Sequence, residues 1–85
     1  MNKVNAYCIL DTKSTIFNQP HFLINDAVAL RQFQMIVQDK ESMISKYPED
    51  YRLYCVGSFD MLTGTFTPEL SPREIAHGLQ FKKEQ

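Results

Sequence analysis

The pattern of apolar and polar residues predicts two β-strands, in which successive side chains point to opposite faces of a sheet. The first covers residues 5–11. One of its faces carries Tyr7 and Ile9, and the other carries Ala6, Cys8 and Leu10. Both faces are largely apolar, so we expect a central strand that is covered on both sides.

The second strand covers residues 51–60 and is predicted to form a hairpin with the residues that follow. One face would carry Tyr51, Leu53, Cys55 and Phe59, and the other Arg52, Tyr54, Val56, Ser58 and Asp60. Gly64 can supply the positive φ that closes the hairpin loop. The return strand is expected over residues 65–67, because Pro68 would stop it.

A helical pattern follows a short strand predicted at residues 22–24. Asn25 or Asp26 can cap this helix, and Val28 and Met35 lie beside its apolar stripe, where they would widen the core face or contact a second subunit. The stripe itself consists of Ala29, Leu30, Phe33, Ile36 and Val37. Residues 39–46 fit either a separate helical turn or a continuation, and the step into Pro48 ends the helix in both cases.

A second helix is predicted near the C-terminus. Ser71 stands at a capping position, Pro72 follows at the first helical position, and Glu74 completes a capping box. Gly78 would end this helix in the left-handed conformation. Residues 79–83 would then be extended, with a basic end.

The length of 85 residues corresponds to one domain, spanning residues 1–85. The predicted fold class is α+β: a small antiparallel sheet of three to five strands, one main helix packed on it, and a short C-terminal helix. No stretch is apolar enough to span a membrane or to act as a signal segment, so we expect a cytoplasmic protein. Such a small core favours a homo-oligomer, with a dimer as the commonest form.

The chemistry-bearing residues do not indicate an enzyme. Cys8 and Cys55 are isolated among apolar neighbours and are interpreted as buried, reduced thiols. His21 and His77 are far apart in the sequence, so neither a metal site nor a cofactor site is predicted. The acidic residues that precede turns are expected to solvate loops or to accept hydrogen bonds from turn amides.

Arg52 and Tyr54 form the candidate binding site, because they share one face of the second strand. An aromatic ring can stack on a base while a neighbouring cation contacts phosphate, which is how many proteins bind single-stranded DNA. Further cations would extend the path if the fold brings them near: Lys13, Arg73, Lys82 and Lys83. Alternatively, Tyr54 packs under the helix or on a partner chain, and Arg52 is a solvated edge residue.

The chain also resembles a known phage family in a set of short motifs. The string Pro-Glu-Asp-Tyr-x-Leu-Tyr-x-x-Gly-x-Phe-Asp at residues 48–60, followed by Thr63-Gly64, is similar to the small non-structural DNA-binding proteins of gokushoviruses, which are single-stranded DNA phages of the microvirus family. Additional matching segments are Tyr7 to Asp11, Phe22 to Ala27, Ser71-Pro72 and Gly78 to Phe81. The resemblance carries over no individual binding residues.

This resemblance implies a role in synthesis or packaging of the phage genome, through binding of single-stranded DNA. The formal net charge of −1 points in the other direction, because strong non-specific DNA binders are usually basic. The alternative hypothesis is therefore a non-catalytic interaction module, an adaptor to phage replication or procapsid proteins with little or no DNA contact.

Overall fold

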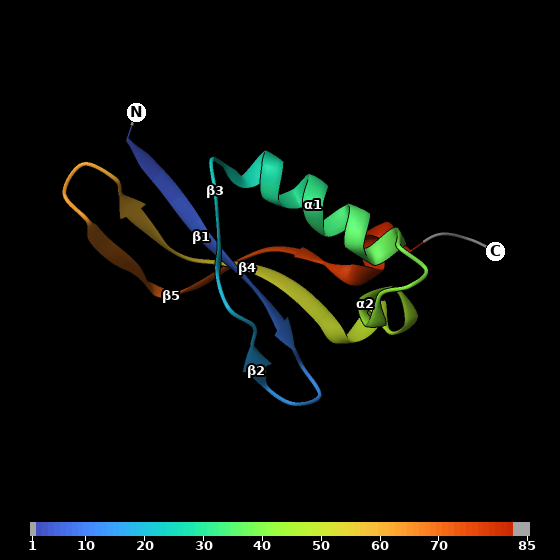
Figure 1. The fold of residues 1–85 in the computed structure, drawn as a ribbon. Helices are drawn as coiled ribbons and strands as arrows, with labels where there is room; N and C mark the ends of the chain where they lie inside the picture. The colour runs from blue at the N-terminus through green and yellow to red at the C-terminus, as the bar shows by residue number, and fades with distance from the viewer. Residues whose placement is uncertain (1, 83–85) are drawn as a thin grey trace.

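The computed structural model describes residues 2–82, which form one curled antiparallel sheet with a helical layer on one face (Figure 1). The strands are β1 (Lys3–Asp11), β2 (Ile16–Phe17), β3 (His21–Leu23), β4 (Tyr51–Asp60) and β5 (Thr65–His77). The helices are α1 (Asp26–Gln38) and α2 (Met43–Lys46), with 3-10 turns η1 (Pro48–Asp50) and η2 (Gly78–Phe81). The predicted α+β class is confirmed.

The strand β1 is central, as its apolar sequence predicted. It pairs with β4 along one edge and with the short strands β2 and β3 along the other, while β5 pairs with the far edge of β4. The molecule measures 47 × 24 × 18 Å, and the loop end of the β4–β5 hairpin extends beyond the start of α1 (Figure 1).

The core lies between α1 and one face of the sheet. Asn25 caps α1 by accepting a hydrogen bond from the amide of Val28, so the first of the two predicted caps is the one used. The apolar stripe packs on the sheet as predicted, with Phe33 at its centre. The buried cluster consists of Tyr7, Ala29, Phe33, Val37, Leu53, Cys55 and Ala76.

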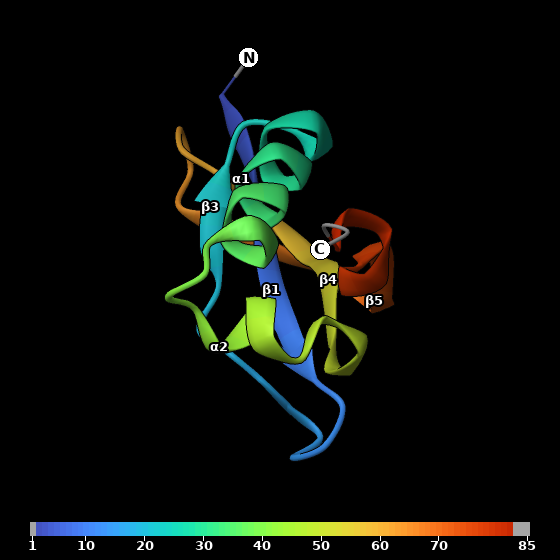
Figure 2. The same cartoon turned by 90° about the vertical axis from the view of Figure 1, so that its right-hand side faces the viewer.

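The short elements after α1 complete this layer (Figure 2). The helix α1 ends at Gln38, and α2 is a separate turn capped by Ser42, which settles the alternative left open by the sequence. The turn η2 packs against the end of α1, where Phe81 contacts Phe33 edge-on and its carbonyl accepts a hydrogen bond from the Gln38 side chain. Of the two flanking residues, Val28 is half-buried and Met35 is exposed.

The two predicted turns form through the expected side chains. Asp11 Oδ1 accepts a hydrogen bond from the amide of Lys13 at 2.9 Å, and Asp60 Oδ1 accepts one from the amide of Leu62 at the same distance. Gly64 has φ of +74°, which closes the β4–β5 hairpin.

The predicted helix at Ser71 is wrong, because β5 runs without a helix from Thr65 to His77. Its backbone pairs with β4 instead, with Arg73 opposite Cys55 and Ala76 opposite Leu53. Only about seven residues separate the cap from Gly78, and so short a helix gains less than a paired and partly buried strand. The prolines are tolerated because β5 is an edge strand, so Pro68 did not end it.

The expected role of Gly78 is also wrong. Gly64 is the glycine with positive φ in the described part of the chain, and Gly78 starts η2, so the segment after it is not extended. A Cβ atom at Gly78 would lie 2.2 Å from the carbonyl oxygen of Pro48. Glycine is therefore required here for close approach of two backbone segments.

Candidate nucleic-acid interface

The sheet has a second face that no helix of residues 2–82 covers, and this face is aromatic. A β-bulge after Cys55 changes the alternation of β4, so Gly57 pairs with Ala6 and Phe59 with Val4. The prediction that Phe59 shares a face with Leu53 is therefore wrong, since the bulge adds one residue and moves Phe59 to the face of Tyr54. We call this surface the aromatic face; its aromatic residues are Phe17, Phe22, Tyr54, Phe59 and Phe66.

Two edge-to-face pairs join strands across the aromatic face. The rings of Phe17 and Tyr54 have centroids 5.4 Å apart, and those of Phe22 and Phe59 are 5.9 Å apart. The register places Cys8 opposite Tyr54, and places Phe22 opposite Ala6. Ala6 and Cys8 are nevertheless buried. The sequence predicted that β1 is covered on both faces, and on this face the cover consists of side chains from neighbouring strands of the same sheet.

These aromatic rings also remain open to solvent. Phe17 is 39% exposed, Phe22 49% and Phe66 43%, whereas Tyr54 and Phe59 are partly buried. Gly57 provides the space for Phe66, because a Cβ atom at Gly57 would lie 2.4 Å from Cζ of the Phe66 ring. Exposed aromatic rings fixed on a sheet present flat apolar surfaces on which planar groups can stack.

Arg52 and Tyr54 lie on the aromatic face together, in the arrangement that the sequence predicted. Arg52 is opposite Leu10, and Tyr54 is opposite Cys8 on β1 and Glu74 on β5. Arg52 Nη1 donates to Glu74 Oε2 at 2.8 Å, and both side chains are partly exposed. The cation is therefore available at the surface, but it has an internal carboxylate partner.

The other predicted cations do not extend this site as one path. Lys13 lies in the turn after β1, at the end of the sheet near Arg52. Arg73 is on the helix side, where Nη1 donates to Asp26 Oδ2 at 2.9 Å and Nε lies 4.0 Å from Glu69. Lys82 follows η2 in the helix layer, and Lys83 lies outside the described residues.

A polar cluster anchors the start of α1 to the sheet. Tyr7 donates its hydroxyl hydrogen to Asp26 Oδ1 at 2.6 Å, and Asn5 donates to the Tyr7 oxygen at 2.9 Å. Burial and the hydrogen bond to Asp26 raise the pKa of Tyr7 to about 12. Hydrogen bonds from Arg73 and Tyr7 lower the pKa of Asp26 below its usual value. Each group of this cluster is satisfied by another, so the cluster has a structural role.

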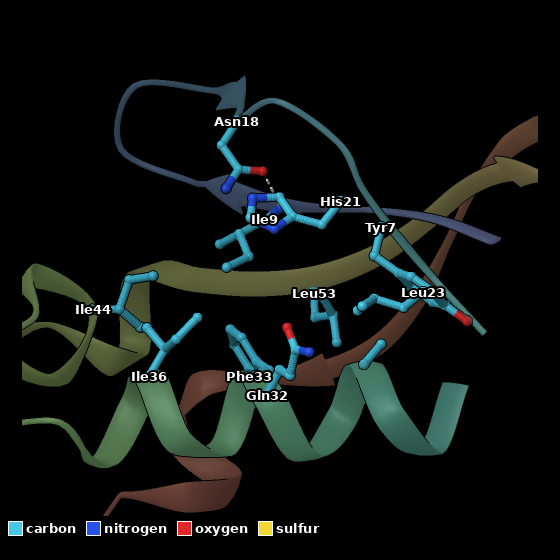
Figure 3. A pocket seen from close by; sticks show the side chains of 11 residues that line it. Tyr7, Ile9, Asn18, His21, Leu23, Gln32, Phe33, Ile36, Ile44 and Leu53 are labelled. Carbon is cyan, nitrogen blue, oxygen red and sulfur yellow. Dashed lines mark hydrogen bonds between the residues drawn. The ribbon is translucent and has the colours of Figure 1, made fainter. Parts of the chain in front are cut away.

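A cavity of about 180 Å³ opens between α1 and the sheet beside β3 (Figure 3). Its walls are mainly aliphatic and aromatic, and Asn18 accepts a hydrogen bond from the amide of Ile9 at 2.7 Å. Polar side chains in its lining are Asn18, His21 and Gln32. This cavity has no nucleophile paired with a base, and residues 2–82 contain no group of three His, Cys, Asp or Glu side chains suited to a metal.

Comparison with known proteins identifies the family. Residues 4–81 match the family described as Phage ORF5 protein. The chain belongs to the phage ORF5 protein family. No curated protein matches the chain, and no solved structure matches it.

Membership of the phage ORF5 protein family confirms the phage part of the resemblance noted in the sequence. The match covers the helical layer and the sheet, including Tyr54, Arg52 and the aromatic pairs. No helix among residues 2–82 is both long enough and apolar enough to cross a membrane.

Sequence reasoning found two members of the site and missed the residues around them. Phe17 and Phe22 lie on either side of Pro20 in a segment with no clear alternation, and Phe66 lies in the short predicted return strand. Their common face depends on pairing with β1 and β4, which the local pattern does not specify. The signal in the sequence was its composition. Aromatic residues make up 12% of the chain, and the predicted helix places only Phe33 in its core stripe, so most aromatic rings must lie elsewhere.

Proposed function

We propose that this phage ORF5 family protein binds single-stranded DNA through the aromatic face and acts without catalysis during synthesis or packaging of the phage genome. The observation that carries the proposal is the set of half-exposed rings on the same sheet face as Arg52, a face that no helix of residues 2–82 covers. Bases of a single strand stack on such rings, with about 1–3 kcal/mol lost per base when one ring is removed.

The chemistry of the face favours single strands over duplexes. In a duplex the bases are stacked on one another and their flat surfaces are inaccessible, whereas single strands offer them for stacking on aromatic side chains. The formal net charge of −1 leaves few cations to neutralise phosphates. We therefore expect micromolar or weaker affinity per subunit and a shallow salt dependence, with a slope of about 0.7 per phosphate contacted.

Fluorescence anisotropy of a short labelled oligonucleotide tests this proposal with two matched variants. Phe22 is 49% exposed on the aromatic face, and Tyr47 is 51% exposed outside the sheet. Phe22→Leu should weaken binding about fivefold or more, while Tyr47→Leu should leave the affinity unchanged. Equal affinities for both variants, or no binding by the wild type in low salt, would reject the aromatic face as a DNA site.

Tyr54 provides a second test, because the sequence named it as a stacking residue. Tyr54→Phe keeps the ring and should retain affinity, whereas Tyr54→Leu should lose it. If Tyr54→Leu instead changes the oligomeric state while the affinity per folded subunit stays constant, Tyr54 is a packing residue.

A second candidate function is an adaptor to phage replication or procapsid proteins. Exposed apolar side chains of the β4–β5 hairpin support it: Met61 and Leu62 lie in its loop, and Leu70 on β5 is fully exposed. Exposed apolar side chains often become buried in protein interfaces. Alanine substitution of all three should abolish partner binding and leave oligonucleotide binding intact, which separates the two candidates.

We also propose that the chain forms a homodimer, because many large apolar side chains are exposed on a small domain. Sedimentation equilibrium at micromolar concentration should give twice the monomer mass. A monomer at all concentrations tested would contradict this proposal.

A further inference from the structure

One carboxylate stands within the proposed DNA site, directly beside its cation. Glu74 is opposite Tyr54 in the β4–β5 register, and its Oε2 accepts a hydrogen bond from Arg52 Nη1 at 2.8 Å. Both side chains are partly exposed, at 37% for Arg52 and 40% for Glu74, so water and ligands reach the pair. This acidic residue is unexpected on a surface that meets phosphates.

A carboxylate and a phosphate compete for the same guanidinium. Both are anions with several acceptor oxygens, and arginine binds either through parallel N–H donors. Glu74 already forms an ion pair with Arg52. A phosphate can therefore bind Arg52 only if this pair opens, or if the guanidinium donates hydrogen bonds to both anions. In either case the negative charge of Glu74 remains near the incoming phosphate and opposes it.

We propose that Glu74 is an internal competitor of DNA. Its carboxylate binds Arg52 in place of a phosphate, which lowers the affinity for DNA and makes the salt dependence of binding shallower. This inference rests on the proposed function, since it concerns the strength of DNA binding at the aromatic face. Stacking on the rings then supplies most of the affinity, while the contribution of Arg52 is largely cancelled by Glu74.

The consequence for the protein is easy release of DNA. A site that holds a strand by stacking and carries a neutralised cation exchanges strands readily, because no strong ionic contact must be broken. Such exchange suits a protein that covers a strand temporarily before it is handed to another phage component.

Glu74→Gln tests the inference, because it removes the charge and keeps the shape of the side chain. Oligonucleotide affinity should rise about two- to fivefold in low salt, and the slope of log affinity against log salt should steepen by up to about 0.7. The rise in affinity is specific to Glu74 if neutralising another glutamate on the same strand produces no rise.

Glu69→Gln is the matched control. Glu69 lies on the same strand, has the same exposed fraction of 40%, and also faces an arginine, Arg73, at 4.0 Å. This arginine is on the helix side, so Glu69→Gln should leave both affinity and salt slope near wild type. The melting temperatures of both variants confirm that the fold is retained.

Removal of Arg52 decides whether the effect passes through the ion pair. In an Arg52→Gln background, Glu74→Gln should raise the affinity much less, because no cation is left to be released. An equal rise in both backgrounds, or an equal rise for Glu69→Gln, would overturn the inference while the proposed function stands. Absence of oligonucleotide binding by every variant would reject the proposed function and this inference with it.

Discussion

The two faces of the sheet both carry large apolar side chains, but these are buried on one face and partly exposed on the other. On the helix side, Phe33 and Leu53 are almost completely buried between α1 and the strands. On the aromatic face, Phe22 and Phe66 lie on strands that no other element of residues 2–82 covers. The helix side therefore accounts for the stability of the fold, and the aromatic face retains apolar surface that folding alone does not explain.

This contrast has a physical basis in how each ring is held. Phe33 is surrounded on all sides, so its removal leaves a cavity as well as losing burial. Phe22 contacts Phe59 on one side and faces solvent on the other. A half-exposed ring contributes less to stability, and its exposure favours a role in binding.

The largest expected effect is on the helix side. Phe33→Ala should lower the free energy of unfolding by roughly 3–5 kcal/mol, which is enough to unfold a small domain of marginal stability. Phe22→Ala should cost clearly less, and Met35→Ala on the exposed side of α1 should stay within about 0.5 kcal/mol of wild type. Urea unfolding followed by circular dichroism measures all three; equal losses for Phe33→Ala and Phe22→Ala would remove the contrast between the faces.

Gly57 tests how tightly the aromatic face is built. A Cβ atom there would lie 2.4 Å from the Phe66 ring and 2.7 Å from the carbonyl oxygen of Thr67, so Gly57→Ala must displace both. We expect a loss of about 1–3 kcal/mol from this overpacking, because the ring can move but the backbone oxygen yields less easily.

Gly64→Ala is the control for Gly57→Ala, because it should destabilise the fold through backbone strain and not through overpacking. A Cβ atom at Gly64 meets nothing within 4 Å, but its φ of +74° is unfavourable for alanine, at a cost of about 1–2 kcal/mol. Gly57→Ala should shift the chemical environment of Phe66 in NMR spectra, and Gly64→Ala should leave the rings unaffected. Unchanged Phe66 signals in Gly57→Ala would show that the face adapts to the extra methyl group.

The elements that the sequence predicted correctly have strong local signals. The stripe of α1 and its Asn25 cap, the turns at Asp11 and Asp60, and the positive φ of Gly64 each follow from a few neighbouring residues. The central position of β1 follows from its two apolar faces. Such features depend little on distant parts of the chain.

The elements that were predicted wrongly depend on distant partners. Ser71-Pro72 has a good local helix signal, yet the residues after it pair with β4 and bring Ala76 into the core. No local sequence pattern predicts the bulge after Cys55, yet it moves Phe59 from one face to the other. The aromatic face could not be predicted for the same reason, because four strands contribute rings to it.

The smallest expected effect concerns the cluster that attaches α1 to the helix side of the sheet. Hydrogen bonds from Arg73 and Tyr7 lower the pKa of Asp26, so the folded state favours its carboxylate. The resulting stability is fully present above the unfolded-state pKa of about 3.9 and is lost as the pH falls through the folded-state pKa. Asp26 is 44% exposed, so we expect Asp26→Asn to lower the free energy of unfolding at neutral pH by no more than about 1 kcal/mol.

The pH dependence makes this small effect measurable. The difference between wild type and Asp26→Asn should shrink as the pH is lowered, because the wild-type carboxyl becomes neutral as well. Glu41→Gln removes an exposed carboxylate for which residues 2–82 provide no ion pair, and it should change stability little at any pH. Thermal unfolding across the acid range measures this difference. A gap between wild type and Asp26→Asn that stays constant with pH would assign the loss to the shape of the side chain, and the charge of Asp26 would then contribute nothing to holding α1 against the sheet.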